Sequence, residues 1–235
     1  SMTETLTEIA EMYKAVAPNV SIVFNFDSSG TLQTQIEEGA VCDLFISAAQ
    51  KQMDALDASK SGGENPKGQD FVEPGTRVNL LESKVALAVP EGNPKGIMSF
   101  ADLAGKLKAG DVLMALGNSD VPVGQYTQKI LAYFGLDETE LAKAGCITYG
   151  SNVKEVTTQV YEASVDCGVV YATDAFSAGL EVVDTATKEM CGQVIYPAAV
   201  MKNSRNREAA QAFLDYLKTD ECMAVFERVG FSPAE

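Results

Sequence analysis

Three turns that lead from a strand into a helix carry small or hydroxyl residues, and none of them adds a lysine or an arginine. The clearest is Asp27-Ser28-Ser29-Gly30, between an apolar strand predicted over 20–26 and a helix predicted over 31–36. A second strand, predicted over 43–47, ends in Ala48-Ala49. The first N–H groups of a helix lack partners within the helix and carry about half a positive charge. Several such ends at one place bind an anion without a cationic side chain, so the pattern predicts an anion-binding protein.

Composition excludes several kinds of partner. A net charge of −15 over 235 residues argues against binding to nucleic acid or to anionic membrane surfaces. It also opposes long-range attraction of an anionic ligand. Exposed carboxylates are screened beyond ~8 Å at physiological salt, however, whereas backbone dipoles in a closed pocket act at contact distance. The apolar runs are strand-length, short of the ~18 residues of a membrane helix, and we expect no export signal within this sequence.

The residues needed for the common catalytic and metal sites are missing from the sequence. There is no histidine, which removes the Ser-His-Asp triad, the Cys-His pair and the usual general base. The five cysteines form no C-x-x-C pair, so zinc spacing is absent as well. We interpret the cysteines as small buried residues and leave one disulfide open. The sequence therefore predicts neither an enzyme nor a bound cofactor.

Strand and helix patterns alternate along the chain, which predicts an α/β fold with largely parallel sheets. Two segments, Ser99–Asp102 and Asn152–Glu155, have the spacing of a capping box at the start of a helix. The segment 58–77 is rich in glycine, proline and polar residues and is predicted to be a surface loop. Further strands are predicted over 85–89, 112–116, 167–171 and 194–201, and two amphipathic helices over 205–218 and 220–229.

Several short motifs occur in the order and spacing of one known family. They are Ser1-Met2-Thr3, Phe26–Leu32, Gly39–Ala48, Val121–Tyr126, Gly168–Ala175, Tyr196-Pro197, Phe213–Leu217 and Gly230-Phe231. Together they resemble the molybdate-binding proteins of ABC importers, over nearly the whole chain apart from the 58–77 loop.

This resemblance implies a type II periplasmic-binding-protein fold, in which two α/β lobes clamp an oxyanion in the cleft between them and close on it. Lobe I would comprise residues 1–83 and 197–235, and lobe II residues 84–196. Carried over by position, the oxyanion-binding residues would be Ser1, Ser29, Ala48, Val123, Val153 and Tyr171. The three hydroxyls and the backbone N–H groups of Ser29, Ala48, Val123 and Val153 would donate hydrogen bonds. A fully ionised tetrahedral dianion only accepts hydrogen bonds, so a pocket made of donors leaves no hydrogen-bonding group unpaired.

The resemblance also implies the ligand, the partners and the location of the protein. The ligand would be molybdate or tungstate, held through its oxygens with no direct metal ligand from the protein. The partners would be the membrane permease and the ATPase subunits of an ABC importer, with the binding protein itself a monomer. The location would be extracytoplasmic, either in the periplasm or lipid-anchored at the outer face of the cell membrane. Open alternatives are another tetrahedral oxyanion (phosphate or sulfate), an enzyme on the same fold, and an effector domain of a transcription factor.

Each candidate residue also has a purely structural interpretation. Ser29 suits the N-cap of a helix, Tyr171 suits the end of a core strand, and Ala48 suits close packing. Ser1 alone would be a disordered end. Members of the family carry a strand just before the position of Ser1, in the middle of the first lobe's sheet. Either the sequence is trimmed there or something else must cover that sheet.

Asp27 is a second departure from the family pattern, because a small residue is more usual before the Ser-Ser turn. Its carboxylate could accept the proton of a monohydrogen oxyanion such as phosphate. A solvent-facing aspartate that caps the helix from outside the pocket is the other interpretation.

Overall fold

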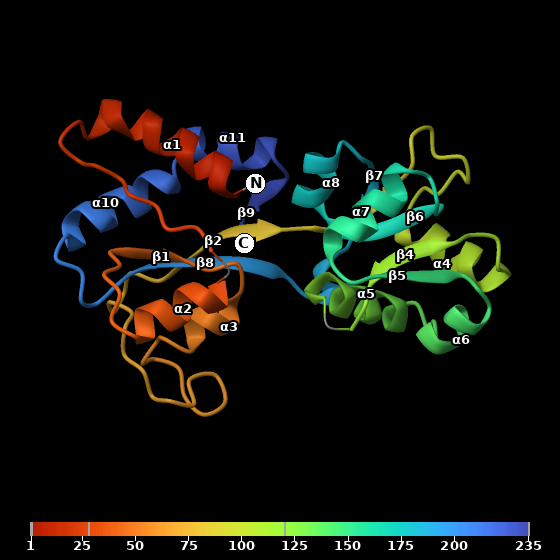
Figure 1. The fold of residues 1–235 in the computed structure, drawn as a ribbon, viewed down its shortest axis with the longest axis horizontal. Coiled ribbons are helices and arrows are strands. Elements are labelled where there is room, and N and C mark those ends of the chain that lie inside the picture. Colours follow the sequence, from red (N-terminus) through yellow and green to blue (C-terminus); the bar gives the residue numbers. More distant parts are fainter. Residues whose placement is uncertain (1, 28, 120, 235) are drawn as a thin grey trace. The chain divides into compact units, whose positions relative to one another are not determined.

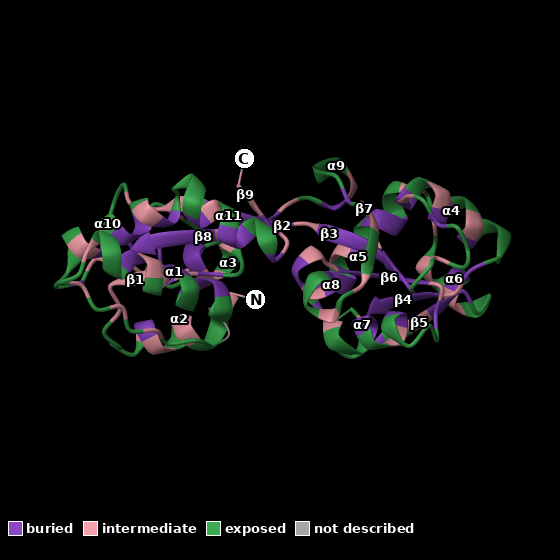
Figure 2. Ribbon diagram, turned by 90° about the horizontal axis from the view of Figure 1, so that it is seen from above, coloured by how far each residue is buried: buried purple, intermediate pink, exposed green. Residues whose placement is uncertain are grey.

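The computed structural model describes residues 2–27, 29–119 and 121–234. Helices and strands alternate along the chain, as Figure 1 shows. The chain divides into two compact units, here called unit 1 (residues 1–82 and 194–235) and unit 2 (residues 83–193). The strands β3, β4, β6 and β8 are almost entirely buried inside their own units (Figure 2).

Unit 1 contains a sheet with the strand order β1-β8-β2-β9. The strands are β1 (Leu44–Ile46), β8 (Val194–Val200), β2 (Val78–Ser83) and β9 (Phe231–Pro233). The helices are α1 (Met2–Val16), α2 (Ser29–Glu37), α3 (Gln50–Asp54), α10 (Arg207–Leu217) and α11 (Asp220–Arg228). β1 and β8 run antiparallel, with Phe45 opposite Ala199.

The two faces of this sheet are covered by different helices because side chains alternate along a strand. Ala198 and Val200 belong to a core formed with α1, α10 and α11. Ala199 and Met201 belong to a second core, to which α2 and α3 contribute. Figure 1 shows the first group of helices above the strands of unit 1 and the second group below them.

The prediction of a strand over 20–26 is wrong, although the segment has the expected alternation. Val20, Ile22 and Phe24 are half-buried against the core beneath α1 and α10, whereas Val23 is 88% exposed. The segment is extended and pairs with no strand among the described residues. A β-strand is defined by its ladder of hydrogen bonds, so a suitable sequence without a neighbour at ladder distance forms none.

The predicted 58–77 loop is irregular, apart from one isolated bridge between Val72 and Met201. It is nevertheless fixed at its base. The Asn65 amide donates to the carbonyl oxygens of Asp57 and Gln69 at 2.9 and 2.8 Å, and Asn65 is buried. The loop therefore returns to unit 1 through specific hydrogen bonds and is not a free linker.

Unit 2 contains a sheet with the order β5-β4-β6-β3-β7. Its strands are β3 (Val85–Val89), β4 (Met114–Gly117), β5 (Ile147–Gly150), β6 (Cys167–Tyr171) and β7 (Glu181–Thr185). Its helices are α4 (Phe100–Ala109), α5 (Pro122–Tyr133), α6 (Glu138–Lys143), α7 (Val153–Tyr161), α8 (Ala172–Ala178) and α9 (Lys188–Cys191).

Only part of this sheet is parallel. β4 runs parallel to both β5 and β6, whereas β3 runs antiparallel to β6 and β7. The prediction of largely parallel sheets is therefore wrong for β3, and also for the β1–β8 pair of unit 1. Alternation of strands and helices along a chain does not specify which strands become neighbours, and β3 lies beside β6 instead of β4.

Both predicted capping boxes cap helices. Ser99 accepts from the Asp102 N–H at the start of α4, and Asn152 accepts from the Glu155 N–H at the start of α7. All five cysteines are free thiols, and only Cys42 among them is partly accessible. Within the described residues, no group of three or more histidine, cysteine or carboxylate side chains is placed to hold a metal ion. None of the helices described there is both long and apolar enough to cross a bilayer.

Candidate functional site

In unit 1, the structure brings two of the predicted residues together. Ser29 begins α2, and Ala48 follows β1. The Ala48 N–H donates to Ser29 Oγ at 2.8 Å. A hydroxyl that accepts one hydrogen bond keeps its own proton to donate, so Ser29 can still donate to an anion. In this structure the Ala48 N–H orients the serine, and its donation to an anion stays a prediction.

Buried polar groups fix the turn that carries Ala48. The hydroxyl of Ser47, which is fully buried, donates to the Ala49 carbonyl at 2.7 Å and accepts from the Ala49 N–H at 3.3 Å. Ala49 is the N-cap of α3 and provides no side-chain cap for its first N–H groups. Ala49 therefore leaves the first N–H groups of α3 without a cap from its own side chain, on a turn held by hydrogen bonds.

Arg77 holds both ends of α3. Its guanidinium donates to Gln50 and Asp54 at 2.6 Å each, and to Asp57 at 2.7 Å. Burial alone would raise the pKa of Asp57, but hydrogen bonds from Ser59 and Arg77 lower it below its usual range. Sequence reasoning missed this arginine, because its partners lie 20 to 27 positions away along the chain.

In unit 2, three helices begin at the same edge of the sheet. β5, β4 and β6 are neighbouring parallel strands, and each is followed directly by a helix: α7, α5 and α8 respectively. Parallel strands end at one edge, where ligands bind in open α/β sheets. The three residues predicted for lobe II lie at these helix starts. Val123 is the second residue of α5, Val153 is the first of α7, and Tyr171 precedes α8.

The three helix starts differ in how their N–H groups are satisfied. Among the described residues, the N-cap residues of α5 and α8, Val121 and Tyr171, provide no side-chain cap. At α7, Asn152 accepts from the Glu155 N–H at 2.9 Å, and Glu155 accepts from the Ser151 N–H at 2.6 Å. Val123 is fully buried and its side chain is apolar. Its backbone N–H is therefore the only hydrogen-bond donor of this residue. An uncapped helix start with a buried apolar side chain suits an anion bound through the backbone.

Tyr126, on α5, is a neighbour of the site that the prediction left out. Its ring meets that of Tyr171 edge to face, with centroids 6.4 Å apart. Burial raises the pKa of the Tyr126 hydroxyl above its usual value, which keeps this group protonated and able to donate at neutral pH. The segment Val121–Tyr126 contributed to the family resemblance, which is the signal that could have pointed to Tyr126.

The turn from β4 into α5 depends on Gly124. A Cβ atom there would lie 2.3 Å from the carbonyl oxygens of both Gly117 and Asn118. We expect Gly124→Ala to lower the free energy of unfolding by about 1–3 kcal/mol, the usual cost of overpacking, and to displace the start of α5. Urea denaturation would measure this change.

Gly105→Ala is the matched control for this substitution. Gly105 is exposed within α4, and an added Cβ would meet nothing within 4 Å. Alanine there should raise stability by about 0.5–1 kcal/mol through helix propensity. Equal unfolding midpoints for the two variants would contradict the close approach at Gly124.

One predicted residue cannot be placed. Ser1 lies outside the described residues, so its part in the site stays a prediction. Of the other candidates, the structure places Ser29 beside Ala48 in unit 1, and Val123, Val153 and Tyr171 along one sheet edge of unit 2. Their binding of an anion stays a prediction.

Comparison with known proteins assigns the family. The family model described as "Bacterial extracellular solute-binding protein" matches residues 1–232. The chain belongs to this family. It is 35% identical to YvgL of Bacillus subtilis, named as a substrate-binding lipoprotein of an ABC transporter, across 99% of this chain and 83% of that protein. It is 32% identical to the molybdate-binding protein ModA of Escherichia coli, across 99% of this chain and 86% of ModA.

Solved structures agree with this assignment. The substrate-binding domain of a molybdenum ABC transporter from Clostridium difficile matches with a TM-score of 0.86 and 31% identity, over 100% of this chain and 95% of that one. A more distant relative, the aconitate isomerase of a Pseudomonas species, is 23% identical across 97% of this chain and 83% of that protein. The family and the periplasmic-binding-protein type of α/β fold expected from the motifs are thus confirmed.

Proposed function

We propose that this solute-binding protein captures one molybdate or tungstate ion outside the cytoplasm and delivers it to the permease and ATPase subunits of an ABC importer. The bound species is the intact oxyanion, held through its oxygens by hydroxyl and backbone donors. The protein acts as a monomer, needs no cofactor and performs no chemical step.

The observation that carries this proposal is the set of donors at strand-to-helix turns. Ser29 keeps a hydroxyl proton beside Ala48, and the uncapped starts of α5 and α8 lie at one edge of the unit 2 sheet. A tetrahedral dianion accepts hydrogen bonds from donors of this kind. Hydrogen bonds to an ion are roughly twice as strong as those between neutral groups, which supports tight binding without a lysine or arginine. Similarity to ModA and to the molybdenum-transporter domain supports the choice of anion.

Because one relative is an isomerase, enzymatic activity is the alternative function to consider. Proton transfer in enzymes most often uses a histidine, and the chain has none. The groups assigned to the anion are hydroxyls and backbone amides, and the carboxylates in the first turns of α7 and α8, Glu155 and Asp174, are not among them. The binding function therefore accounts for the site without a catalytic residue.

Thermal denaturation with and without molybdate tests this proposal. Ligand at about 1,000 times its dissociation constant stabilises a folded protein by ~4 kcal/mol. For a chain of this length that corresponds to a rise in Tm of roughly 8–16 °C. Sodium chloride at the same ionic strength is the control. A Tm that molybdate and tungstate leave unchanged would contradict the proposed function.

A further inference from the structure

Gln50, the first residue of α3, links this helix to β2. The side-chain oxygen of Gln50 accepts from Arg77 Nη2 at 2.6 Å, and its side-chain nitrogen donates to Asn79 Oδ1 at 2.9 Å. Arg77 and Asn79 are two positions apart where β2 begins, so their side chains leave the same side of the chain. Because an arginine only donates, the oxygen of the Gln50 amide must face it. The first residue of α3 is therefore held in one orientation against β2.

The hydrogen bond to Gln50 is not needed to neutralise Arg77. The guanidinium also donates from Nη1 to Asp57 at 2.7 Å and from Nη2 to Asp54 at 2.6 Å. Asp54 is further paired with Lys60, with 3.9 Å between the charged atoms. The positive charges of Arg77 and Lys60 cancel the negative charges of the two aspartates. An effect of Arg77 on a bound anion would therefore come from geometry and not from net charge.

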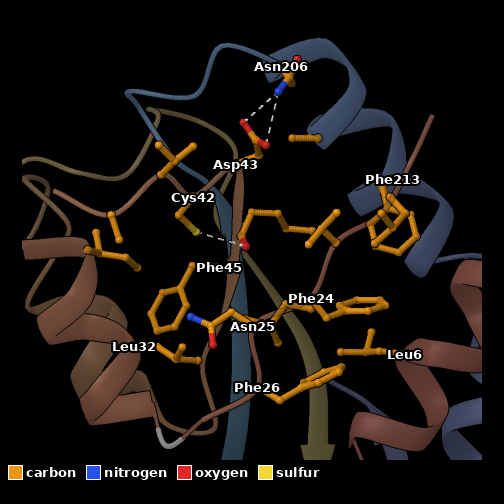
Figure 3. Close-up of a pocket in the computed structure, with 18 of the residues that line it drawn as sticks. Leu6, Phe24, Asn25, Phe26, Leu32, Cys42, Asp43, Phe45, Asn206 and Phe213 are labelled. Atoms are coloured by element: carbon orange, nitrogen blue, oxygen red, sulfur yellow. Dashed lines mark hydrogen bonds between the residues drawn. The ribbon is translucent and has the colours of Figure 1, made fainter. Parts of the chain in front are cut away.

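Packing alone does not fix the start of α3. The helix has five residues, and Met53 is the one apolar residue among them. Met53 belongs to the core that α2 also contacts, in which Leu32 lies beside Phe45 of β1 (Figure 3). A helix of little more than one turn owes its place to tertiary contacts, and a single apolar side chain leaves its rotation open. The polar contacts with Arg77 supply the missing constraint.

The turn that precedes Gln50 carries the donors assigned to the anion in unit 1. Ala48 and Ala49 are exposed, so the packing of their side chains does not position them. The turn is instead held at its two ends, by the buried Ser47 hydroxyl on one side and by the Gln50 amide on the other. Between these ends, the Ala48 N–H donates to Ser29 Oγ at 2.8 Å. A displacement of Gln50 would move the Ala48 N–H and loosen the hydrogen bond that orients Ser29.

We propose that Arg77 is a positioning residue of the oxyanion site, which acts through Gln50 on the pair formed by Ala48 and Ser29. Arg77 itself is assigned no contact with the anion. It fixes the first turn of α3, and with it the orientation of the Ser29 hydroxyl. The inference rests on the proposed function in one respect, namely that Ser29 donates to the anion. A lysine in place of Arg77 would keep the charge but not the planar fork that reaches three partners from two nitrogens.

Gln50→Met tests this proposal with little disturbance of the fold. It removes both side-chain hydrogen bonds of Gln50, keeps a residue of similar helix propensity, and leaves the ion pairs of Arg77 with Asp54 and Asp57 in place. Asn79, which loses its partner, is exposed and can bond to water. We expect the affinity for molybdate, measured by calorimetry, to fall about 10-fold, because a hydrogen bond to an ion weakens when its donor is displaced.

Gln211→Met is the matched control. Gln211 is half-buried on α10 and donates to Asp215 of the same helix at 3.1 Å, so the same substitution breaks a hydrogen bond away from the turn. It should leave the affinity for molybdate unchanged. Ser29→Ala supplies a second comparison. In that background Gln50→Met should weaken binding by less than about 3-fold, because the hydroxyl that it displaces is already gone. Arg77→Lys should weaken binding as much as Gln50→Met does.

Hydrogen exchange of the Ala48 amide gives a readout that needs no anion. In the ligand-free protein, Gln50→Met should speed the exchange of this amide by about 10-fold, whereas Gln211→Met should leave it unchanged. Unchanged exchange of Ala48 in Gln50→Met would overturn the positioning role, whether or not molybdate binds. Failure of the unsubstituted chain to bind molybdate is the separate result that would overturn the proposed function.

Three affinity results would also overturn the proposal. One is an unchanged affinity for molybdate in Gln50→Met. Another is an equal loss of affinity on Gln50→Met with and without the Ser29 hydroxyl, because the effect would then act elsewhere. The third is an unchanged affinity in Arg77→Lys, which would show that only the charge matters. Where Arg77→Lys does not fold, Gln50→Met decides the outcome, since it leaves the ion pairs of Arg77 intact.

Discussion

Ser29→Ala and Tyr171→Phe should each weaken molybdate binding by about 10- to 150-fold. Each substitution removes one hydroxyl donor, and a hydrogen bond to a charged group contributes ~1.5–3 kcal/mol. Ser29 already accepts from Ala48 at 2.8 Å, so its alanine variant also leaves that N–H without its partner. Isothermal titration calorimetry with each purified variant would measure the change.

Two matched substitutions control for indirect effects. Ser99→Ala removes the N-cap of α4 and should cost about 0.5–2 kcal/mol of stability without changing affinity. Tyr133→Phe removes a hydroxyl from a side chain that is 55% exposed, and should change neither quantity. If Ser29→Ala and Tyr171→Phe bind molybdate as tightly as the controls do, the site lies elsewhere.

The second large effect is selectivity among anions. Sulfate has the same charge as molybdate but is smaller, and it cannot reach every donor of a pocket sized for the larger ion. Each donor left unpaired costs ~1–3 kcal/mol, so two of them weaken sulfate binding by about 30-fold or more. Tungstate, which matches molybdate closely in size and charge, should bind with similar affinity. Calorimetry with each anion in turn would measure these differences, and equal affinities for sulfate and molybdate would contradict a pocket of that size.

Phosphate differs from sulfate in carrying a proton at neutral pH. A pocket made only of donors has no acceptor for that proton, so phosphate should also bind weakly. Asp27, which is exposed at the turn before α2, carries a carboxylate that could accept the phosphate proton. Tight phosphate binding that Asp27→Asn abolishes would assign the protein to phosphate instead.

Local signals in the sequence predicted much of what positions the site. Ser99 and Asn152 cap their helices because a capping box needs only four consecutive residues. The apolar runs at 85–89 and 167–171 are strands buried in unit 2. The helix starts at Val123 and Val153 follow from turns that are equally local.

What the sequence could not predict depends on contacts between distant residues. The segment 20–26 has the alternation of a strand, but a ladder requires a neighbour that local sequence does not specify. The bond between Ala48 and Ser29 spans 19 positions, and the clamp of Arg77 on α3 spans up to 27. Short elements such as α6 and β5 bury too few residues to show a clear periodic pattern of apolar residues in the sequence.

The most direct test of the oxyanion site is equilibrium dialysis against an equimolar mixture of molybdate, tungstate, phosphate and radiolabelled sulfate. Elemental analysis and counting of the retained protein then identify the bound anion. We expect the sum of molybdenum and tungsten to reach one atom per chain, with sulfate and phosphate near background. A protein that retains neither molybdenum nor tungsten, or that fills with sulfate or phosphate from the same mixture, would contradict the account.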